Sequence, residues 1–258
     1  MRVQTVKPQA VDNKKLIKKG KNMNEQNGKI YYYDFEAEMQ QECERDFLMA
    51  AQGMNVLREQ GVEAASMYLN YSARVFSYML SIDENRFIPP EVKSKLAIRH
   101  YTCGGNYFKN ICSVVRKSLK FRPEDWDKDM PEAVKGQDYF TVYRAGIEDI
   151  PEAAKHISWT IFKDVAMWFA EKYIHEGGGK SLHVYKGIIP AKKVIAYLNS
   201  RSEFEIVQNK SVEDIVEIPL ERPAEEYMEI KKATRFTSDH SRMQAYVNAR
   251  LMANRCAS

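Results

Sequence analysis

The sequence of residues 139–146 is YFTVYRAG, and the character of the chain changes at this point. Aromatic and β-branched residues in so short a segment predict a strand, and the small residues at its end are typical of a turn. Before it, apolar residues recur at every third or fourth position. After it, short β-rich segments follow one another. We therefore expect an α+β protein, with helices first and a strand-rich half second.

The residues before this strand predict four helical runs. Apolar positions from Phe35 to Leu57 lie on one face of a long helix, which Gly61 interrupts. A second run covers 67–79, a third begins with Pro90 at its first position, and a fourth covers 107–119. The proline-containing, charged segment 122–138 is predicted to be a loop.

The residues after this strand predict a sheet with one inserted helix. A short strand at 158–160 leads into a helix at 163–174, and three glycines at 177–179 form a loop. Further strands are expected at 182–189, 194–198, 204–207 and 215–219. The chain beyond Pro223 is polar and helical, and it ends in a helix at 241–253.

Composition places the chain among globular proteins. Of its 258 residues, 44% are hydrophobic and 29% are charged, and no apolar run approaches the ~20 residues of a membrane span. Residues 1–10 have no apolar stretch typical of a secretory signal. We therefore expect a cytoplasmic protein without membrane contact.

The charge is concentrated at the N-terminus. The net charge is +4, yet residues 1–30 carry eight basic and two acidic side chains, a net +6. We interpret residues 1–30 as a solvated, flexible tail, with binding of nucleic acid as the alternative. The four cysteines and five histidines show no spacing typical of a metal site, so no metal is expected.

Three short motifs in the second half carry chemistry. Arg144 ends the predicted strand next to a small-residue turn, and its guanidinium suits a phosphate or diphosphate. Ser158 and Thr160 alternate on a strand, so both hydroxyls point the same way. Glu203 and Glu205 also have i, i+2 spacing at the start of a strand, where glutamate is disfavoured. Taken singly, each motif has a plain alternative: a surface arginine, a helix cap and a solvated edge strand.

In this order, arginine, then Ser-x-Thr, then Glu-x-Glu resembles the arginine–serine–glutamate class of mono-ADP-ribosyltransferases. This class includes clostridial binary toxins, bacteriophage enzymes that modify host proteins, and vertebrate ecto-enzymes. Residues 97–102 (AIRHYT) and 107–110 (YFKN) resemble the helical stretch before the catalytic arginine. Residues 194–198 (VIAYL) resemble the strand before the turn that recognises the acceptor, so the similarity covers about residues 90–210.

The resemblance implies a fold, a reaction and a set of roles. The expected fold has N-terminal helices packed on a mainly antiparallel core of two sheets, with NAD bound in a cleft between them. NAD is then a substrate: its nicotinamide leaves and its ADP-ribose moves to a protein acceptor. Glu205 would hold the ribose and Glu203 the acceptor, which glutamate at this position implies to be arginine. Arg144 would bind the diphosphate side of NAD, and Ser158 would brace Glu205.

The resemblance also implies the extent of the site and of the domain. Thr160 would support Ser158, and the neighbours of Arg144 (Tyr143, Ala145 and Gly146) would complete the NAD-binding strand end. The ADP-ribosyltransferase-like domain is expected at 31–222, with a helical part at 31–122 and a strand-rich part at 138–220. A helical extension would follow at 223–258. No GxGxxG motif occurs, so a parallel dinucleotide-binding sheet is not expected.

Two other functions remain open from the sequence. An NAD glycohydrolase of the same fold would pass ADP-ribose to water instead of to a protein. A protein without catalytic activity would use its basic tail and helical half to bind nucleic acid or a partner.

Overall fold

The computed structural model describes residues 23–26, 29–32, 35–176, 182–199, 201–234 and 240–256. Its chain divides into two compact units, residues 1–48 and 49–258. Residues 1–22 of the predicted tail and the predicted loop at 177–179 lie outside the described residues.

The first unit contains two strands and the start of a long helix. Strands β1 (Met23–Gln26) and β2 (Lys29–Tyr32) pair antiparallel, whereas a flexible tail was expected to extend to residue 30. Helix α1 (Phe35–Ala64) begins here and ends in the second unit. The predicted interruption at Gly61 is confirmed: this residue leaves the helical conformation with φ 86°.

The helical part of the second unit follows the predicted runs with one break. Its helices are α2 (Ser66–Leu69), α3 (Ala73–Ser81), α4 (Pro90–Thr102) and α5 (Lys109–Arg116), with 3-10 turns η1 (Asp83–Phe87), η2 (Gly105–Tyr107) and η3 (Ser118–Phe121). The single run expected at 67–79 is wrong, because the Ser72 hydroxyl accepts from the Val75 N–H and starts a new helix there. Pro90 is the first residue of α4 as predicted, and residues 122–138 hold no helix or strand.

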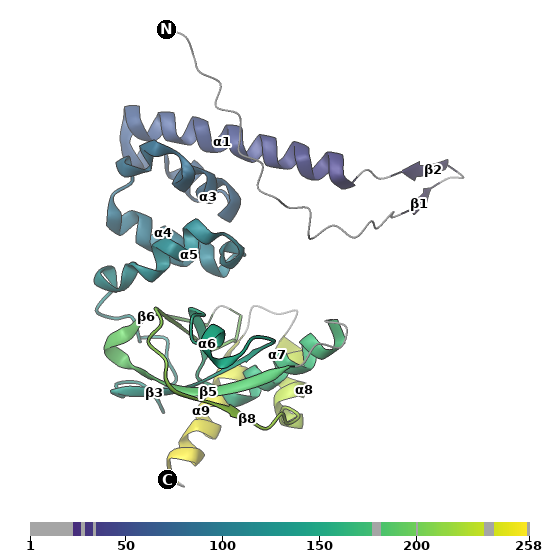
Figure 1. The fold of residues 1–258 in the computed structure, drawn as a ribbon, viewed down its shortest axis with the longest axis vertical. Coiled ribbons are helices and arrows are strands. Elements are labelled where there is room, and N and C mark those ends of the chain that lie inside the picture. The colour runs from purple at the N-terminus through teal and green to yellow at the C-terminus, as the bar shows by residue number, and fades with distance from the viewer. Residues whose placement is uncertain are drawn as a thin grey trace. The chain divides into compact units, whose positions relative to one another are not determined.

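The strand-rich part contains one six-stranded antiparallel sheet with the order β6-β7-β4-β3-β5-β8. Its elements are β3 (Tyr139–Gly146), α6 (Ile150–Ala153), β4 (Ser158–Thr160), α7 (Lys163–Glu176), β5 (His183–Pro190), η4 (Ala191–Lys193), β6 (Val194–Leu198), β7 (Glu205–Gln208), β8 (Glu213–Ile218), α8 (Glu225–Thr234) and α9 (Ser241–Cys256). Figure 1 shows β3, β5 and β8 side by side in this sheet.

The expectation of two sheets is wrong. Strand β4 pairs with β7 along its whole length and also with β3, where Tyr143 lies opposite Thr160. This pair makes the hydrogen bonding continuous across what would otherwise be two three-stranded halves. The predicted α+β class with antiparallel strands is confirmed, and the sheet is bridged at the strand ends that carry the predicted motifs.

Three hydrophobic clusters hold the second unit together, and the smallest packs α7 against β3 and β5 through Ala145, Met167 and Val184. Of the two larger clusters, one is formed by α1–α5 and also takes in Ile157, Ile195 and Val207 from the strand-rich part. The other lies between the sheet and α7–α9, where the ring of Phe162 is 6.0 Å from that of Tyr227 and 5.9 Å from that of Tyr246. The C-terminal helices, expected as an extension, therefore contribute to the core of the sheet. Among the described helices, none has the length and apolar character needed to cross a membrane.

Candidate functional site

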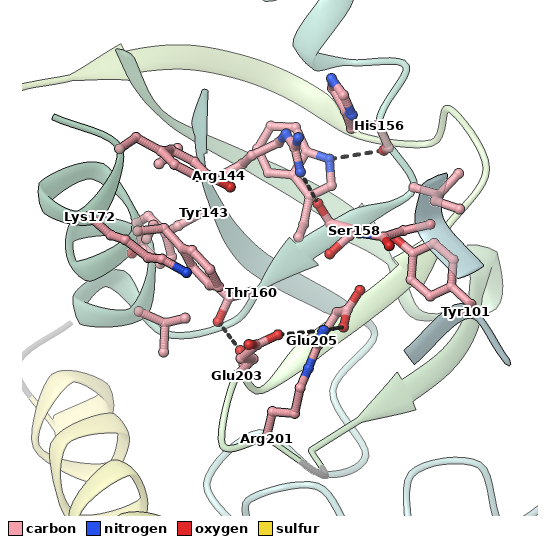
Figure 2. A pocket seen from close by; sticks show the side chains of 18 of the residues that line it. Tyr101, Tyr143, Arg144, His156, Ser158, Thr160, Lys172, Arg201, Glu203 and Glu205 are labelled. Carbon is pink, nitrogen blue, oxygen red and sulfur yellow. Dashed lines mark hydrogen bonds and ion pairs between the residues drawn. The ribbon is translucent and has the colours of Figure 1, made fainter. Parts of the chain in front are cut away.

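A cleft of about 570 Å³ opens where β3, β4 and β7 meet beside the helical part. Ligand-binding clefts are typically about 300–1,000 Å³. Seven of the eight predicted site residues line it: Tyr143, Arg144, Ala145, Ser158, Thr160, Glu203 and Glu205. Figure 2 shows the side chains of Arg144, Ser158 and Glu205 around this cleft.

The strand register brings these residues together. Tyr143 on β3 lies opposite Thr160 on β4, and Thr160 lies opposite Glu205 on β7. Neighbouring strands are about 5 Å apart, so residues distant in the sequence become neighbours across them. The eighth predicted residue, Gly146, does not line the cleft. The Glu148 carboxylate fills the space that a Cβ at this position would occupy.

Arg144 is held by two bonds within the protein. Its Nε lies 3.2 Å from Glu148 Oε1, and its Nη1 donates to the backbone oxygen of Ser158 at 3.0 Å. A guanidinium has five N–H donors, so these bonds leave others for a ligand. The arginine is thus oriented before any ligand binds.

Glu148 is the counter-ion of Arg144, and sequence reasoning missed it. Its Oε1 also lies 3.0 Å from His156 Nε2, and its Oε2 accepts from the Ile147 N–H at 2.9 Å. Burial alone would raise the pKa of Glu148, but the hydrogen bond from His156 and the charge of Arg144 lower this pKa to about 2. Glu148 therefore stays ionised and keeps Arg144 in place.

Glu205 is the most deeply buried carboxylate at the cleft, with 5% of the residue exposed. Burial raises its pKa to about 7, and the nearby Glu203 adds to this effect. A hydrogen bond from the Ser158 side chain and the charges of Arg201 and Arg144 act in the opposite direction. Tyr101 of α4 also lines the cleft, and its pKa is raised by burial and by the charge of Glu205.

Glu203 does not lie on a strand, so the predicted placement of both glutamates on one strand face is wrong. Strand β7 begins at Glu205, and Glu203 belongs to a turn in which Ser202 and Phe204 have φ of 54° and 49°. The Thr160 hydroxyl donates to the backbone oxygen of Glu203 at 2.7 Å and accepts from the Phe162 N–H. This hydroxyl fixes the turn, which still aims Glu203 into the cleft.

Arg201 faces both glutamates from the same turn. Its Nη2 lies 2.8 Å from Glu203 Oε2 and 3.8 Å from Glu205 Oε2. Half of its side chain is exposed, whereas those of Glu203 and Glu205 are 18% and 6% exposed. Figure 2 shows Arg201 at the two carboxylates.

The residues that sequence reasoning missed come mainly from other elements. Glu148 and His156 are close in sequence to Arg144 and Ser158, but they meet only because the chain folds back after β3. Tyr101 comes from α4 and reaches the site through tertiary structure. Arg201 could have been predicted from the sequence, because an arginine two positions before Glu203 can pair with it across a turn. Aromatic side chains of Tyr107, Phe169 and Tyr173 also line the cleft.

Among the described side chains, no group of three or more His, Cys, Asp or Glu residues could hold a metal ion. Comparisons of this chain with models of protein families, with curated proteins and with solved structures found no match.

Proposed function

We propose that this protein is a mono-ADP-ribosyltransferase, which moves ADP-ribose from NAD to an arginine of a protein acceptor and releases nicotinamide. The observation that carries the proposal is the gathering of Arg144, Ser158 and Glu205 at one cleft, with Glu203 beside them. The proposal also draws on the order of these residues in the sequence, which resembles that of the arginine–serine–glutamate class.

The proposed reaction needs stabilisation of a cation. Breaking the bond between nicotinamide and ribose leaves positive charge on the ribose ring, as in glycoside hydrolysis. Catalysis requires groups that favour this charge more than they favour NAD itself. Glu205 meets the need, because a carboxylate shielded from water interacts strongly with a developing charge. Burial disfavours the ionised form of Glu205 and raises its pKa, whereas a cation bound nearby would favour the ionised form.

Arg144 is proposed to bind the diphosphate of NAD. Its guanidinium is held by hydrogen bonds to Glu148 and to the Ser158 backbone. A guanidinium that is already oriented loses little conformational entropy when it binds a phosphate. Ser158 is proposed to keep the Glu205 carboxylate in place, because its side chain acts on that carboxylate and lowers its pKa against the effect of burial.

Glu203 is proposed to orient the acceptor arginine and take its proton. Its carboxylate already pairs with a guanidinium, that of Arg201, at 2.8 Å. It is also more exposed than Glu205, which suits contact with a second protein.

The test compares Glu205→Gln with Glu203→Gln in two assays, nicotinamide release and labelling of lysate proteins by labelled NAD. Loss of one transition-state contact typically costs about 10²–10³-fold in rate. We expect Glu205→Gln to lose both activities by about this factor. Glu203→Gln should lose protein labelling and keep slow release of nicotinamide, because its proposed work is on the acceptor.

Three results would contradict the proposal. Free ADP-ribose without labelled protein in the wild type would indicate a glycohydrolase. Equal loss of both activities in Glu203→Gln would remove the argument for an arginine acceptor. No NAD cleavage by the wild type would indicate a binding protein.

A further inference from the structure

An arginine of the chain itself lies where the acceptor arginine is proposed to bind. The Arg201 guanidinium is 2.8 Å from Glu203, the proposed acceptor residue, and 3.8 Å from Glu205, the proposed ribose-binding residue. The guanidinium is thus close to both of the carboxylates that are proposed to assist the transfer.

The backbone around Arg201 is held in place. Lys231 of α8 donates to the backbone oxygen of Arg201 at 3.2 Å. The hydroxyl of Ser202, the next residue, lies 2.6 Å from His240 Nδ1 at the start of α9. The position of Arg201 therefore follows from the packing of two helices against the turn.

The other arginines that line the cleft are less suited to modification. Arg144 is bound to Glu148 and to Ser158, and one fifth of its side chain is exposed. Arg116 donates from Nη2 to the backbone oxygen of Lys155. Arg201 combines a half-exposed side chain with direct contact to both glutamates.

We propose that Arg201 is a site of self-modification, at which the protein attaches ADP-ribose from NAD to its own guanidinium. This inference rests on the proposed function and adds an acceptor to it.

The reaction balances as an ordinary transfer. The bond between C1′ of the ribose and the nicotinamide nitrogen breaks, and its electron pair leaves with neutral nicotinamide. Glu203 takes one proton from the Arg201 guanidinium, and the freed nitrogen lone pair forms a bond to C1′. The product is an ADP-ribosylated guanidinium that keeps its positive charge, and the proton passes from Glu203 to water.

The test incubates the purified full chain with NAD. Intact-mass spectrometry should show the addition of one ADP-ribose, and peptide mapping should place it on Arg201. Arg201→Lys keeps the positive charge, and Arg201→Gln removes it. Both should lose the adduct, whereas the matched control Arg222→Lys, at an exposed arginine outside the cleft, should keep it.

Two further measurements define the route. Dilution of the protein should leave the fraction modified per unit time unchanged, because the acceptor and the carboxylates belong to one molecule. Glu203→Gln should lose the adduct while nicotinamide release continues.

The outcomes separate this inference from the proposed function. If the wild type labels lysate proteins but carries no adduct on Arg201, the inference is wrong and the transferase proposal stands. An adduct of undiminished amount in Arg201→Lys would have the same meaning. Absence of NAD cleavage in the wild type would overturn both.

Discussion

Burial and charge oppose each other at Glu205. The carboxyl is withdrawn from water, which raises its pKa from 4.5 to about 7 in spite of the Ser158 hydrogen bond and two nearby arginines. The folded protein therefore binds a proton that the unfolded chain gives up more easily. The stability that comes from this group is fully present below about pH 4.5 and is lost as the pH rises through about 7.

Replacing Glu205 by glutamine should remove this pH dependence. A pKa difference of this size corresponds to about 3 kcal/mol. The free energy of unfolding of Glu205→Gln minus that of the wild type should therefore be larger at pH 8 than at pH 4 by about that amount. Urea unfolding followed by tryptophan fluorescence at both pH values measures it.

The control for this experiment is Glu229→Gln, which removes an exposed carboxylate of α8. We expect only a small change in stability from it, as for most surface substitutions. A difference between Glu205→Gln and the wild type that stays constant from pH 4 to pH 8 would contradict the argument.

At the scale of single residues, the sequence predicted which residues lie at the cleft better than it predicted their contacts and burial. The motifs of Ser158 and Glu205 could be found because each residue begins a strand. Arg144 was expected to end its strand, but β3 continues to Gly146. Glu148 could not be found, because its contact with Arg144 needs the turn after β3 to fold back. The unusual pKa of Glu205 also depends on burial by other elements, which no local pattern shows.

At the scale of elements, the cleft depends on strand β4, which has three residues and connects β3 to β7. The Thr160 side chain also links β4 to the turn before β7, because its hydroxyl donates a hydrogen bond to the backbone oxygen of Glu203 at 2.7 Å. The sequence predicted most strands to within one or two residues, and 194–198 without error. It placed Glu203 on a strand, because alternation of glutamate and phenylalanine does not reveal the positive φ of Ser202 and Phe204.

Thr160→Val tests the link between β4 and the turn that carries Glu203. Valine keeps the shape but leaves the Glu203 oxygen and the Phe162 N–H without this partner, which typically costs about 1–3 kcal/mol in stability. We also expect protein labelling to fall more than nicotinamide release, because the turn positions the proposed acceptor residue.

Thr160→Ser is the matched control, since it keeps the hydroxyl and removes one methyl group. It should retain most of the stability and most of the labelling. If serine and valine have equal effects, the methyl packing and not the hydroxyl determines the position of the turn.

At the scale of the whole second unit, helices and sheet form a site that neither part contains alone. Tyr101 of α4 and Ser158 of β4 line the same cleft, and the helical core takes in Ile157, Ile195 and Val207 from the strand-rich part. The order of helices and strands in the sequence predicted the α+β class. It did not predict a continuous sheet, because this depends on the pairing of Tyr143 with Thr160.

The shared core predicts that residues 49–256 unfold in one transition. All three tryptophans (Trp126, Trp159 and Trp168) lie in the strand-rich part or in the loop before it, so their fluorescence reports on that part. Leu69 lies in the helical core and is 1% exposed. Leu69→Ala should cost about 2–5 kcal/mol through the cavity that it leaves.

Because the two parts share a core, this loss should appear equally in both signals. The urea midpoint should fall by the same amount in tryptophan fluorescence and in far-ultraviolet circular dichroism, although no tryptophan lies in the mutated part. The control is Met67→Ala, at a side chain that is 63% exposed, which should leave both midpoints nearly unchanged. A lower midpoint by circular dichroism alone would show that the helical part unfolds by itself, and Tyr101 would then leave the cleft while the sheet stays folded.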